Sequence, residues 1–318
     1  MRKVLFILGT AHSGSTLLSL MLSSHHKIFA LGELSNLPDF HKKDRSICDI
    51  CEGKCSFWDT QFSSEELNRL TDCLVNQRLH KYIPLKVERQ VRSLIGRDQI
   101  FRPYTKIFSK LPDSVQVLID STKTVWWIEK QLQLPEFRPN GGLKPKLLHL
   151  VKDGRAVIAS QIRRRPNSDI EKLSHKWLQR VTKSQALFES FPQADRLCIA
   201  YEALATEPEK TLREICNFLD LDFTPKLLPY WESEHHFISG NTGTRSLIQK
   251  YRRQESPSDT DSIHQKQNSS SAKDFKYYAD DVGFQIKLDV RWKSELSPEQ
   301  IQAFERIAGE VNRPYAQH

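Results

Sequence analysis

The sequence predicts an α/β fold in which a central parallel sheet is flanked by helices. Short, wholly apolar runs alternate along the chain with longer stretches of helical character. Two of these runs end in polar, glycine-containing loops that open into a helix. Strands that are buried on both faces read as continuous apolar runs, which is typical of parallel sheets with helices on both sides.

Four strands and three following helices carry this pattern. The apolar runs predict strands at residues 3–8, 115–120, 146–151 and 196–200. The stretches behind the first three predict helices at residues 14–24, 123–133 and 154–164. A longer helix runs from residue 170 to residue 191 and has an apolar stripe on one face. We expect this stripe, together with Trp126 and Trp127, in the core; it comprises Ile170, Leu173, Trp177 and Val181.

Three helix starts are marked by capping patterns. Residues 63–66, 206–209 and 297–300 each pair a hydroxyl with an acid or amide three positions later. The last two also place proline in the first turn, where its missing N–H costs no hydrogen bond.

Composition indicates a folded protein with a sizeable core. Of 318 residues, 38% are hydrophobic and 27% are charged, which argues against wholesale disorder. We expect one domain over residues 1–318, with residues 275–318 as a C-terminal extension packing on the core. Residues 254–273 are rich in Ser, Asp, Gln and Asn and predict a flexible loop.

The formal net charge of +8 suits an anionic ligand or surface, although many soluble proteins carry as much. No run of 18 apolar residues is present, which excludes a spanning helix. The five apolar residues after Lys3 are too few for a signal peptide. We therefore expect a soluble, cytoplasmic protein.

Three cysteines, Cys48, Cys51 and Cys55, cluster in a C-x2-C-x3-C spacing. With a fourth ligand from His41 or Cys73 they could form a zinc site. The alternative, that they are thiols without a metal, is the one the sequence favours. The histidines at 25–26 and 235–236 show no ligand spacing shared with an acid, so no metal is assigned.

Residues 9–16, GTAHSGST, follow the first predicted strand and open the first predicted helix. They match the nucleotide-binding pattern G-x-x-x-x-G-K-[ST] at both glycines and at Thr16, but Ser15 stands where that pattern has lysine. Glycines let successive N–H groups turn inward and the helix N-terminus adds partial positive charge, so the loop can hold an anion. The missing lysine argues against ATP or GTP and favours a donor with a shorter phosphate–sulfate unit.

Residues 149–160, HLVKDGRAVIAS, end the third predicted strand and begin its helix. Ser160 and Arg164 are four residues apart and share a helix face. Lys152 at the strand end can converge on that face, and the three groups together would clamp a phosphate. Taken alone, the arginines at 163–165 are equally typical of a solvated helix end. Both loops together suit the two ends of a doubly phosphorylated nucleotide.

These two motifs make the chain similar to the sulfotransferases that use 3′-phosphoadenosine-5′-phosphosulfate (PAPS). The first loop resembles their 5′-phosphosulfate loop, and residues 152–164 resemble their 3′-phosphate motif. The similarity is closest to the branch of tyrosylprotein sulfotransferases and bacterial relatives, and it extends from Met1 to about Arg245. It implies the P-loop sulfotransferase type of α/β fold, PAPS as the donor, and no metal.

The resemblance also implies roles for individual residues. Glu33 matches the general base of the tyrosylprotein branch, and Lys123 matches a lysine near the transferring sulfuryl group. With His12, which would help to hold the departing charge, these are the expected catalytic residues. The expected cofactor-binding residues are His12, Ser13, Gly14, Ser15, Thr16, Lys152, Ser160, Arg164, Tyr201, Asn241 and Arg245.

Two positions depart from the family pattern, which commonly has arginine where His12 and Lys152 stand. Lysine keeps the charge but not the bidentate geometry of arginine, and an imidazole titrates near neutral pH. Cofactor affinity and its pH dependence are the properties that these replacements affect.

The expected reaction is in-line sulfuryl transfer from PAPS to an acceptor hydroxyl, with Glu33 taking the hydroxyl proton. The acceptor stays open among a protein, a sugar, a lipid and a small molecule, and no nucleic-acid partner is expected. Two alternatives are a kinase-like nucleotide phosphotransferase and an inactive basic binding module.

Overall fold

The computed structural model of the chain describes residues 1–42, 46–51, 54–75, 87, 102–255 and 283–316. Its centre is a five-stranded sheet in the order β2-β3-β1-β4-β5, and every neighbouring pair is parallel. The strands are β1 (Arg2–Gly9), β2 (Ile28–Gly32), β3 (Val117–Lys123), β4 (Leu143–Val151) and β5 (Arg196–Ala200). The predicted fold class is therefore confirmed.

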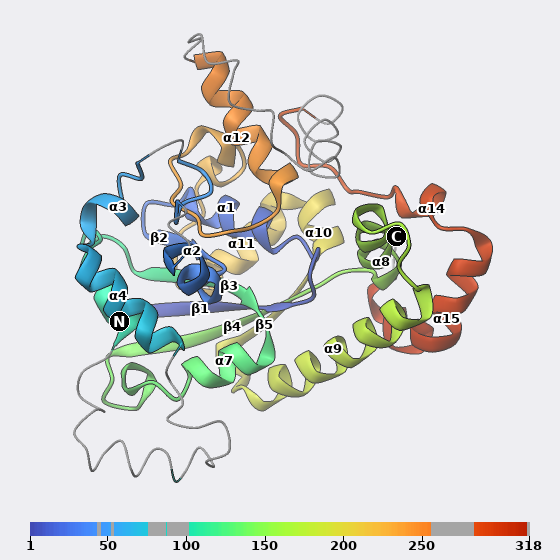
Figure 1. Cartoon of the computed structure of the whole chain (residues 1–318), viewed down its shortest axis with the longest axis horizontal. Helices are drawn as coiled ribbons and strands as arrows, with labels where there is room; N and C mark the ends of the chain where they lie inside the picture. The colour runs from blue at the N-terminus through green and yellow to red at the C-terminus, as the bar shows by residue number, and fades with distance from the viewer. Residues whose placement is uncertain (43–45, 52–53, 76–86, 88–101, 256–282, 317–318) are drawn as a thin grey trace.

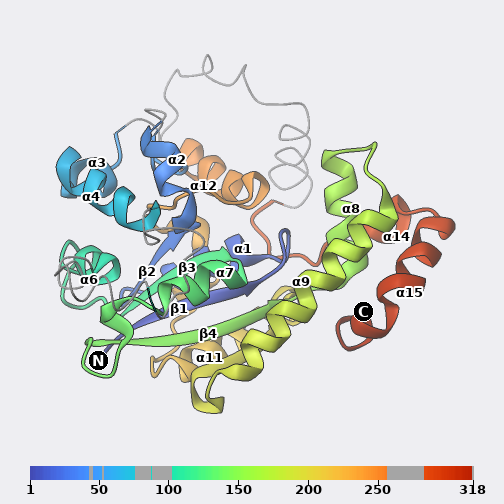
Figure 2. The same ribbon diagram turned by 60° about the horizontal axis from the view of Figure 1, so that its bottom comes forward.

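Helices cover both faces of the sheet (Figures 1 and 2). On one face lie α7 (Val125–Gln131) and α9 (Ile170–Ser190), the latter packed against β1 and β4. On the other face lie α1 (Ser15–Ser23) and α11 (Pro208–Phe218). β1 occupies the middle of the sheet because residues 4–8 are apolar on both sides, and all five are fully buried.

The chain leaves β1 and β4 in opposite directions. The segment after β1 passes through α1 to β2 at one edge of the sheet, whereas α8 (Gly154–Arg164) and α9 lead from β4 to β5 at the other edge. In open α/β sheets, ligands bind outside the carboxyl ends of the strands where the strand order reverses in this way. Because β1 and β4 are neighbours, the loops that follow them lie side by side at this switch point.

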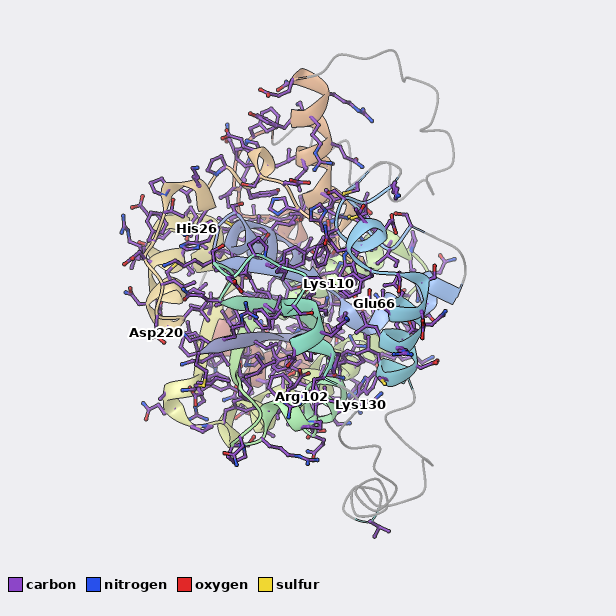
Figure 3. All side chains as sticks on the ribbon, turned by 90° about the vertical axis from the view of Figure 1, so that its left-hand side faces the viewer. His26, Glu66, Arg102, Lys110, Lys130 and Asp220 are labelled. Carbon is purple, nitrogen blue, oxygen red and sulfur yellow. The ribbon has the colours of Figure 1, made fainter. Side chains whose placement is uncertain are left out.

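The remaining helices form the surroundings of this core. They are α2 (Leu37–Lys42), α3 (Trp58–Gln61), α4 (Ser64–Val75), α6 (Pro103–Phe108), α10 (Tyr201–Thr206), α12 (Thr242–Glu255), α14 (Trp292–Glu295) and α15 (Pro298–Asn312). Ion pairs fasten α4 to α6 and to the turn after it: Glu66 meets Lys106 at 2.6 Å and Lys110 at 3.0 Å (Figure 3). Among the described residues, no helix has the length and apolar character needed to cross a membrane.

The C-terminal helices pack on α8 and α9. Phe304 of α15 is fully buried, with its ring centroid 5.5 Å from that of Trp177. Val157, Ile158, Val181 and Ala308 complete the buried cluster around this pair. Since α8 is held between α9 and α15, the end of the chain takes part in positioning the loop after β4.

The element predictions hold with local exceptions. The predicted strands correspond to β1, β3, β4 and β5, while the five-residue strand β2 at the sheet edge was not predicted.

Residues 63–66 and 297–300 form reciprocal capping hydrogen bonds, as expected. The cap at Thr206 was wrong: Thr206 ends α10 and donates its hydroxyl to the Glu202 carbonyl, so α11 begins after Glu207. Of the loop expected at 254–273, residues 256–273 lie outside the described residues.

The expectation for the tryptophan pair was half right. Trp127 is buried and donates its indole N–H to Asp120 at 2.8 Å. Trp126 is 58% exposed, because consecutive residues of the short helix α7 face different sides.

Candidate functional site

A cavity of about 340 Å³ opens between the loops that follow β1 and β4. Eleven of the residues expected from the sequence line it: His12, Gly14, Ser15, Thr16, Glu33, Lys123, Lys152, Ser160, Arg164, Tyr201 and Asn241. Gly14 and Ser160 come from separate strand–loop–helix units about 150 positions apart, yet they face the same space. The strand order described above brings these units together.

The loop after β1 turns at Gly14, whose φ of 91° lies in the left-handed region. A Cβ at this position would lie 2.3 Å from Cδ2 of Tyr201, so only glycine lets that ring pack against the loop. Ser15 and Thr16 then begin α1, and no side chain caps the N-terminus of this helix. The first N–H groups of α1 therefore have no side-chain acceptor from a cap, and they border a cavity that can hold an anion.

Backbone strain is concentrated around this cavity. Among the described residues, four non-glycine residues have positive φ, and three of them line the cavity: His12 at 66°, Lys123 at 72° and Ser239 at 61°. Such conformations cost free energy and persist where the surrounding structure enforces them, often at functional sites. The three residues come from three different loops, so the strain belongs to the site rather than to one turn.

Lys152 places a buried positive charge at one end of the cavity. The residue is 8% exposed and its Nζ lies 3.9 Å from the ring centroid of Tyr201. Burial lowers the pKa of Lys152 below its usual value, and the negative charges of Asp289 and Glu202 counter part of that shift. No carboxylate in the described part of the chain comes within ion-pair distance of this amine. A buried ammonium without an ion-pair partner is costly unless an anion joins it.

Helix α8 presents polar groups from its C-terminal half to the same end of the cavity. Ser160 and Arg164 line the cavity as expected, and Arg163 lines it as well. Arg163 was noted in the sequence but was not assigned to the site. Its guanidinium is held by two bonds to Glu295, at 2.9 and 2.6 Å, so α14 orients this residue. Asp153 caps the N-terminus of α8: its carboxylate accepts a hydrogen bond from the Arg155 N–H at 2.9 Å.

His12 is half-buried among cations. Burial and the charges of Arg164, Lys152, Lys123 and Arg163 together lower the pKa of His12 to about 3, and burial has the largest effect. The imidazole is therefore neutral at pH 7. It can donate a hydrogen bond to an anion, but it adds no positive charge of its own.

Glu33 and Lys123 form an ion pair that also lines the cavity. The Lys123 Nζ lies 2.5 Å from Glu33 Oε1 and also donates to the Ser121 carbonyl at 3.1 Å. The second carboxylate oxygen of Glu33 accepts from the Asn36 amide at 3.3 Å. The backbone N–H of Glu33 donates to the Ile238 carbonyl at 2.7 Å, which fixes the residue at the end of β2.

Asp120 supports this part of the cavity from within the core. It is 1% exposed and accepts hydrogen bonds from Tyr104 at 2.7 Å, from Trp127 at 2.8 Å and from both the N–H and the hydroxyl of Thr122. The carboxylate thus fixes the end of β3, where the pairing register with β1 shifts. Lys123, the last residue of this strand, lines the cavity.

A second cavity of about 850 Å³ adjoins the first. Ala11, Glu33 and Lys123 line both cavities, so the two meet at the ion pair. The exposed ring of Trp126 lines the second cavity, opposite residues of α9 such as Arg180 and Leu187. A molecule in this space would approach the first cavity at Glu33.

Sequence reasoning missed several residues that close the first cavity from later in the chain. They are Tyr230, Thr244, Leu247, Gln285, Ile286, Lys287, Asp289 and Arg291. Ser239 and Gly240, which directly precede the expected Asn241, line the cavity as well. The segment at 285–291 follows a stretch of low complexity and contains no motif, so no local signal marks it. Arg291 is oriented by a bond of 2.6 Å to Asp289.

Two expected residues do not line the cavity. Ser13 is fully buried behind the loop, and its hydroxyl has no hydrogen-bond partner in the described residues. Arg245 donates to the Asp49 carbonyl at 2.6 Å and lies 3.3 Å from the carboxylate of the same residue. The structure therefore assigns the Arg245 side chain to the loop that contains Asp49, and not to the group of cavity residues.

The chain resembles known proteins over most of its length. The profile described as "Sulfotransferase family" matches residues 5–225. A Caenorhabditis briggsae protein, provisionally named a protein-tyrosine sulfotransferase, is 22% identical over 245 residues, which cover 75% of this chain and 71% of that protein.

The chain is also similar to solved structures of sulfotransferase domains. The sulfotransferase domain from the Synechococcus PCC 7002 olefin synthase has a TM-score of 0.51 and 20% identity, covering 96% of this chain and 94% of that one. The sulfotransferase domain from the curacin biosynthetic pathway has a TM-score of 0.49 and 18% identity, covering 98% of both chains. The likeness to the Synechococcus domain supports the P-loop type of α/β fold.

Proposed function

The chain belongs to the sulfotransferase family, and on that premise we propose that it transfers a sulfuryl group from PAPS to a hydroxyl of an acceptor. One observation carries the proposal. The strand–loop–helix units after β1 and β4 line a single cavity, so one nucleotide with a phosphate at each end of its adenosine can contact both. The fold alone would not identify the donor, because P-loop folds bind many different nucleotides.

The charge of the cavity fits such a nucleotide. Its lining includes six lysines or arginines and two carboxylates: Lys123, Lys152, Arg163, Arg164, Lys287 and Arg291 against Glu33 and Asp289. The lack of an ion-pair partner for the Lys152 ammonium is the specific sign that an anion belongs there. Arginine beside lysine and a serine hydroxyl supplies both charge and directed hydrogen bonds for a phosphate.

We assign the two ends of the nucleotide to different residues. Lys152, Ser160 and Arg164 would bind the 3′-phosphate, with Arg163 added by the structure. Ser15, Thr16 and the N–H groups of the first loop would bind the 5′-phosphosulfate. Tyr201, which packs between Gly14 and Lys152, would contact the adenosine.

Glu33 is the proposed general base. The acceptor hydroxyl forms a new O–S bond to the sulfur in line with the breaking bond to the 5′-phosphate oxygen. Its proton passes to Glu33, and the products are a sulfate ester and adenosine 3′,5′-bisphosphate. Lys123 already contacts Glu33 at 2.5 Å, so the same ammonium can stabilise charge on the reacting groups. The neutral His12 would contribute a hydrogen bond.

The acceptor would enter through the second cavity, because that cavity shares Glu33 and Lys123 with the first cavity but none of the α8 residues. Its lining combines the exposed Trp126 ring with the cations Arg180 and Lys183. An aromatic acceptor such as a tyrosine hydroxyl suits this lining, and the name of the Caenorhabditis briggsae relative makes protein tyrosine the first acceptor to test.

The donor site can be tested without knowing the acceptor. Adenosine 3′,5′-bisphosphate should raise the melting temperature without magnesium, by the equivalent of about 2.7 kcal/mol at a hundredfold excess over its Kd. ATP with magnesium should stabilise the protein little. A Ser160→Ala/Arg164→Ala double variant should lose the bisphosphate response, whereas Arg165→Ala, at the next and exposed position, should keep it.

Transfer is then measured with PAPS labelled in its sulfur, using tyrosine peptides, sugars and simple alcohols as acceptors. Label that moves to one acceptor class identifies the substrate. Equal stabilisation by ATP and the bisphosphate, with no label transferred, would contradict the proposal.

A further inference from the structure

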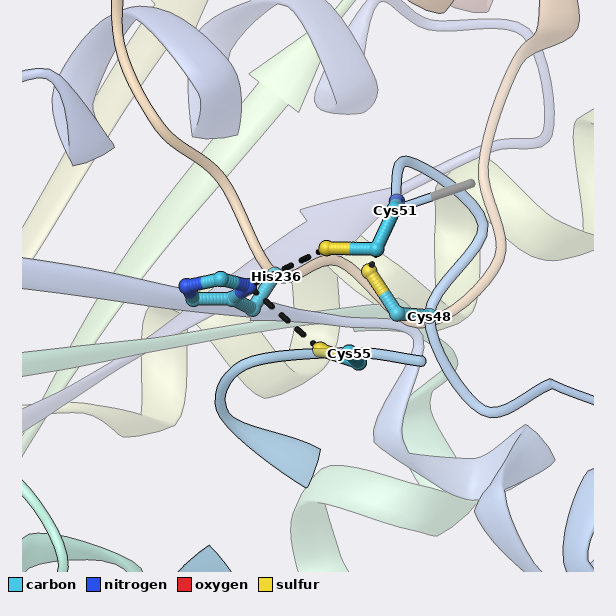
Figure 4. Close-up of side chains that lie close together, drawn as sticks. All are labelled: Cys48, Cys51, Cys55 and His236. Atoms are coloured by element: carbon cyan, nitrogen blue, oxygen red, sulfur yellow. Dashed lines mark hydrogen bonds between the residues drawn. The ribbon is translucent and has the colours of Figure 1, made fainter. Parts of the chain in front are cut away.

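Three cysteines and a histidine meet in one cluster outside the two cavities (Figure 4). Cys48, Cys51 and Cys55 lie on the loop before α3, and His236 lies on the segment that leads to α12. One potential ligand atom from each residue, three thiol sulfurs and an imidazole nitrogen, falls within 4.8 Å of the others. The His236 Nδ1 lies 3.4 Å from both Cys51 Sγ and Cys55 Sγ.

These separations match the edges of a tetrahedral zinc site. Zinc binds thiolate sulfur at about 2.3 Å and imidazole nitrogen at about 2.0–2.1 Å, so sulfur and nitrogen ligands lie about 3.5 Å apart around one ion. The observed distance of 3.4 Å from His236 Nδ1 to each of the two sulfurs agrees with this value. Four ligand atoms packed this closely suit a single ion.

The groups around the cluster also match a metal site. His236 Nε2 lies 3.3 Å from the Glu234 carboxylate, which favours the tautomer with the proton on Nε2 and leaves Nδ1 free to face the sulfurs. Ser56 donates to the same carboxylate at 3.0 Å. Backbone N–H groups of Cys51 and Trp58 donate to the sulfurs of Cys48 and Cys55, at 3.3 and 3.4 Å. Such donors stabilise thiolate charge.

From this geometry we propose that Cys48, Cys51, Cys55 and His236 bind one Zn²⁺ ion. All four positions are protein ligands, so the site is closed and structural. The thiols lose their protons to solvent as the ion binds, and no oxidant or reductant is involved. The proposal is independent of the proposed function, since none of the four residues lines either cavity.

The fourth ligand differs from both candidates that the sequence offered. Cys73 lies on α4 and is not part of the cluster, and the side chain of His41 lies outside the described residues. His236 is 181 residues from Cys55, so no local spacing could reveal it. The sequence favoured thiols without a metal, whereas the tertiary arrangement favours the zinc alternative.

The ion would fasten the cysteine loop to a wall of the first cavity. Asp49 donates its N–H to the Phe237 carbonyl at 2.9 Å, and Ile238 pairs with Gly32 next to Glu33. Ser239, Gly240 and Asn241, which line the cavity, follow directly. Zinc at this position would therefore stabilise the segment that holds Glu33.

Metal content of the full chain tests the proposal. We expect one zinc per chain by elemental analysis of protein purified without a metal-affinity tag. Cys51→Ser should lose the bound zinc, whereas Cys198→Ser, at an exposed cysteine far along the chain, should keep one per chain. Folded wild-type protein without metal, or with two of the three thiols joined in a disulfide, would overturn the proposal.

A second measurement covers the case in which Cys51→Ser fails to fold. Wild-type protein in which Co²⁺ replaces the zinc should show sulfur-to-cobalt charge transfer and the strong visible bands of a tetrahedral site. Removal of the ion by a chelator should lower the melting temperature, and added Zn²⁺ should restore it. Co²⁺ that binds without these bands would contradict the ligand set.

Glu234 is a positioning residue in this proposal, and its variant gives an independent readout. Glu234→Gln should weaken zinc binding about 10–100-fold in competition with a chromophoric chelator. Glu232→Gln, an exposed acid two residues away, is the matched control and should leave affinity unchanged. Equal affinity of both variants would remove Glu234 from the orienting role.

Discussion

At the residue scale, burial decides which groups in the site carry charge. Lys152 is buried over an aromatic ring, where no described carboxylate pairs with it, whereas Lys123 is paired with Glu33. His12 lies among the same cations and stays neutral, since burial and these charges lower its pKa to about 3. The cavity therefore contains a positive charge at Lys152 and an ion pair of Glu33 with Lys123. Fixed charges of this kind can stabilise charge that develops during a group transfer.

Glu33→Gln tests the general base. The amide cannot accept the acceptor proton, so turnover should fall roughly 10²–10⁴-fold. Binding of adenosine 3′,5′-bisphosphate should persist, because Lys152 and the α8 residues are unchanged. Transfer of labelled sulfur and the thermal shift with bisphosphate are measured on the same preparation. Glu209→Gln, at an exposed site on α11, is the control, and undiminished turnover in Glu33→Gln would exclude Glu33 as the base.

Gly14→Ala tests the first loop. The new Cβ would lie 2.3 Å from Tyr201 at a φ of 91°, so the loop or the ring must move and bisphosphate stabilisation should be lost. Gly142→Ala is a matched control: its φ of 90° is the same, but nothing lies within 4 Å of its Cβ. That variant should lose only about 1–2 kcal/mol of stability to backbone strain and keep the bisphosphate response. A normal response in Gly14→Ala would contradict the placement of the nucleotide.

At the scale of elements, the site depends on how α8 is held. The N-terminus of α8 is capped twice: by Asp153, and by Asn312 at the far end of α15. Asn312 is 1% exposed, accepts the Gly154 N–H at 2.7 Å and donates to Asp153 at 3.1 Å. Helix α15 thus supplies a hydrogen-bond acceptor to the N-terminus of α8, the helix that carries Ser160 and Arg164.

Asn312→Ala should therefore affect both stability and binding. The Gly154 N–H would lose its buried acceptor, at a cost of about 1–3 kcal/mol in the free energy of unfolding. Bisphosphate affinity should fall as α8 loosens. Gln302→Ala, on the exposed face of the same helix, is the control in chemical denaturation and thermal shift. If Asn312→Ala and Gln302→Ala behave alike, α15 does not support the site.

At the scale of the whole molecule, several histidines are buried in neutral form. Burial lowers the pKa of His149 and that of His235 to about 4, and His12 is lower still. In the unfolded chain each histidine titrates near 6.5. Between the folded and unfolded values, the unfolded state binds more protons, so the stability contributed by the neutral rings is complete above pH 6.5 and is lost as pH falls.

His149→Phe isolates one of these contributions. His149 is 1% exposed on β4 and its ring centroid lies 5.6 Å from that of Phe188, so phenylalanine can occupy the position. The wild-type protein should lose on the order of 1 kcal/mol per pH unit more than the variant between about pH 6.5 and pH 4. His175→Gln, at an exposed position on α9, should leave the wild-type slope unchanged. Denaturation at several pH values measures this, and parallel curves for wild type and His149→Phe would refute it.

Local patterns were enough to predict four of the five strands and both loops that line the first cavity. The run at residues 3–8 and the glycine loop after it are contiguous, so their apolar periodicity and turn chemistry are visible in the sequence. The resemblance to a family added Glu33 and Lys123. Strand β2 was not predicted, although it is as long as the predicted β5 and both lie at edges of the sheet.

The order of the strands, and with it the set of neighbours around each side chain, came from packing across the whole chain. Packing turned Arg245 toward Asp49, brought residues 285–291 over the cavity and placed His236 among three cysteines of a distant loop. These arrangements join segments up to about 280 positions apart, and each depends on which faces of the elements are buried together. A linear pattern records the preference of each segment, whereas the contacts between segments follow from the lowest free energy of the packed whole.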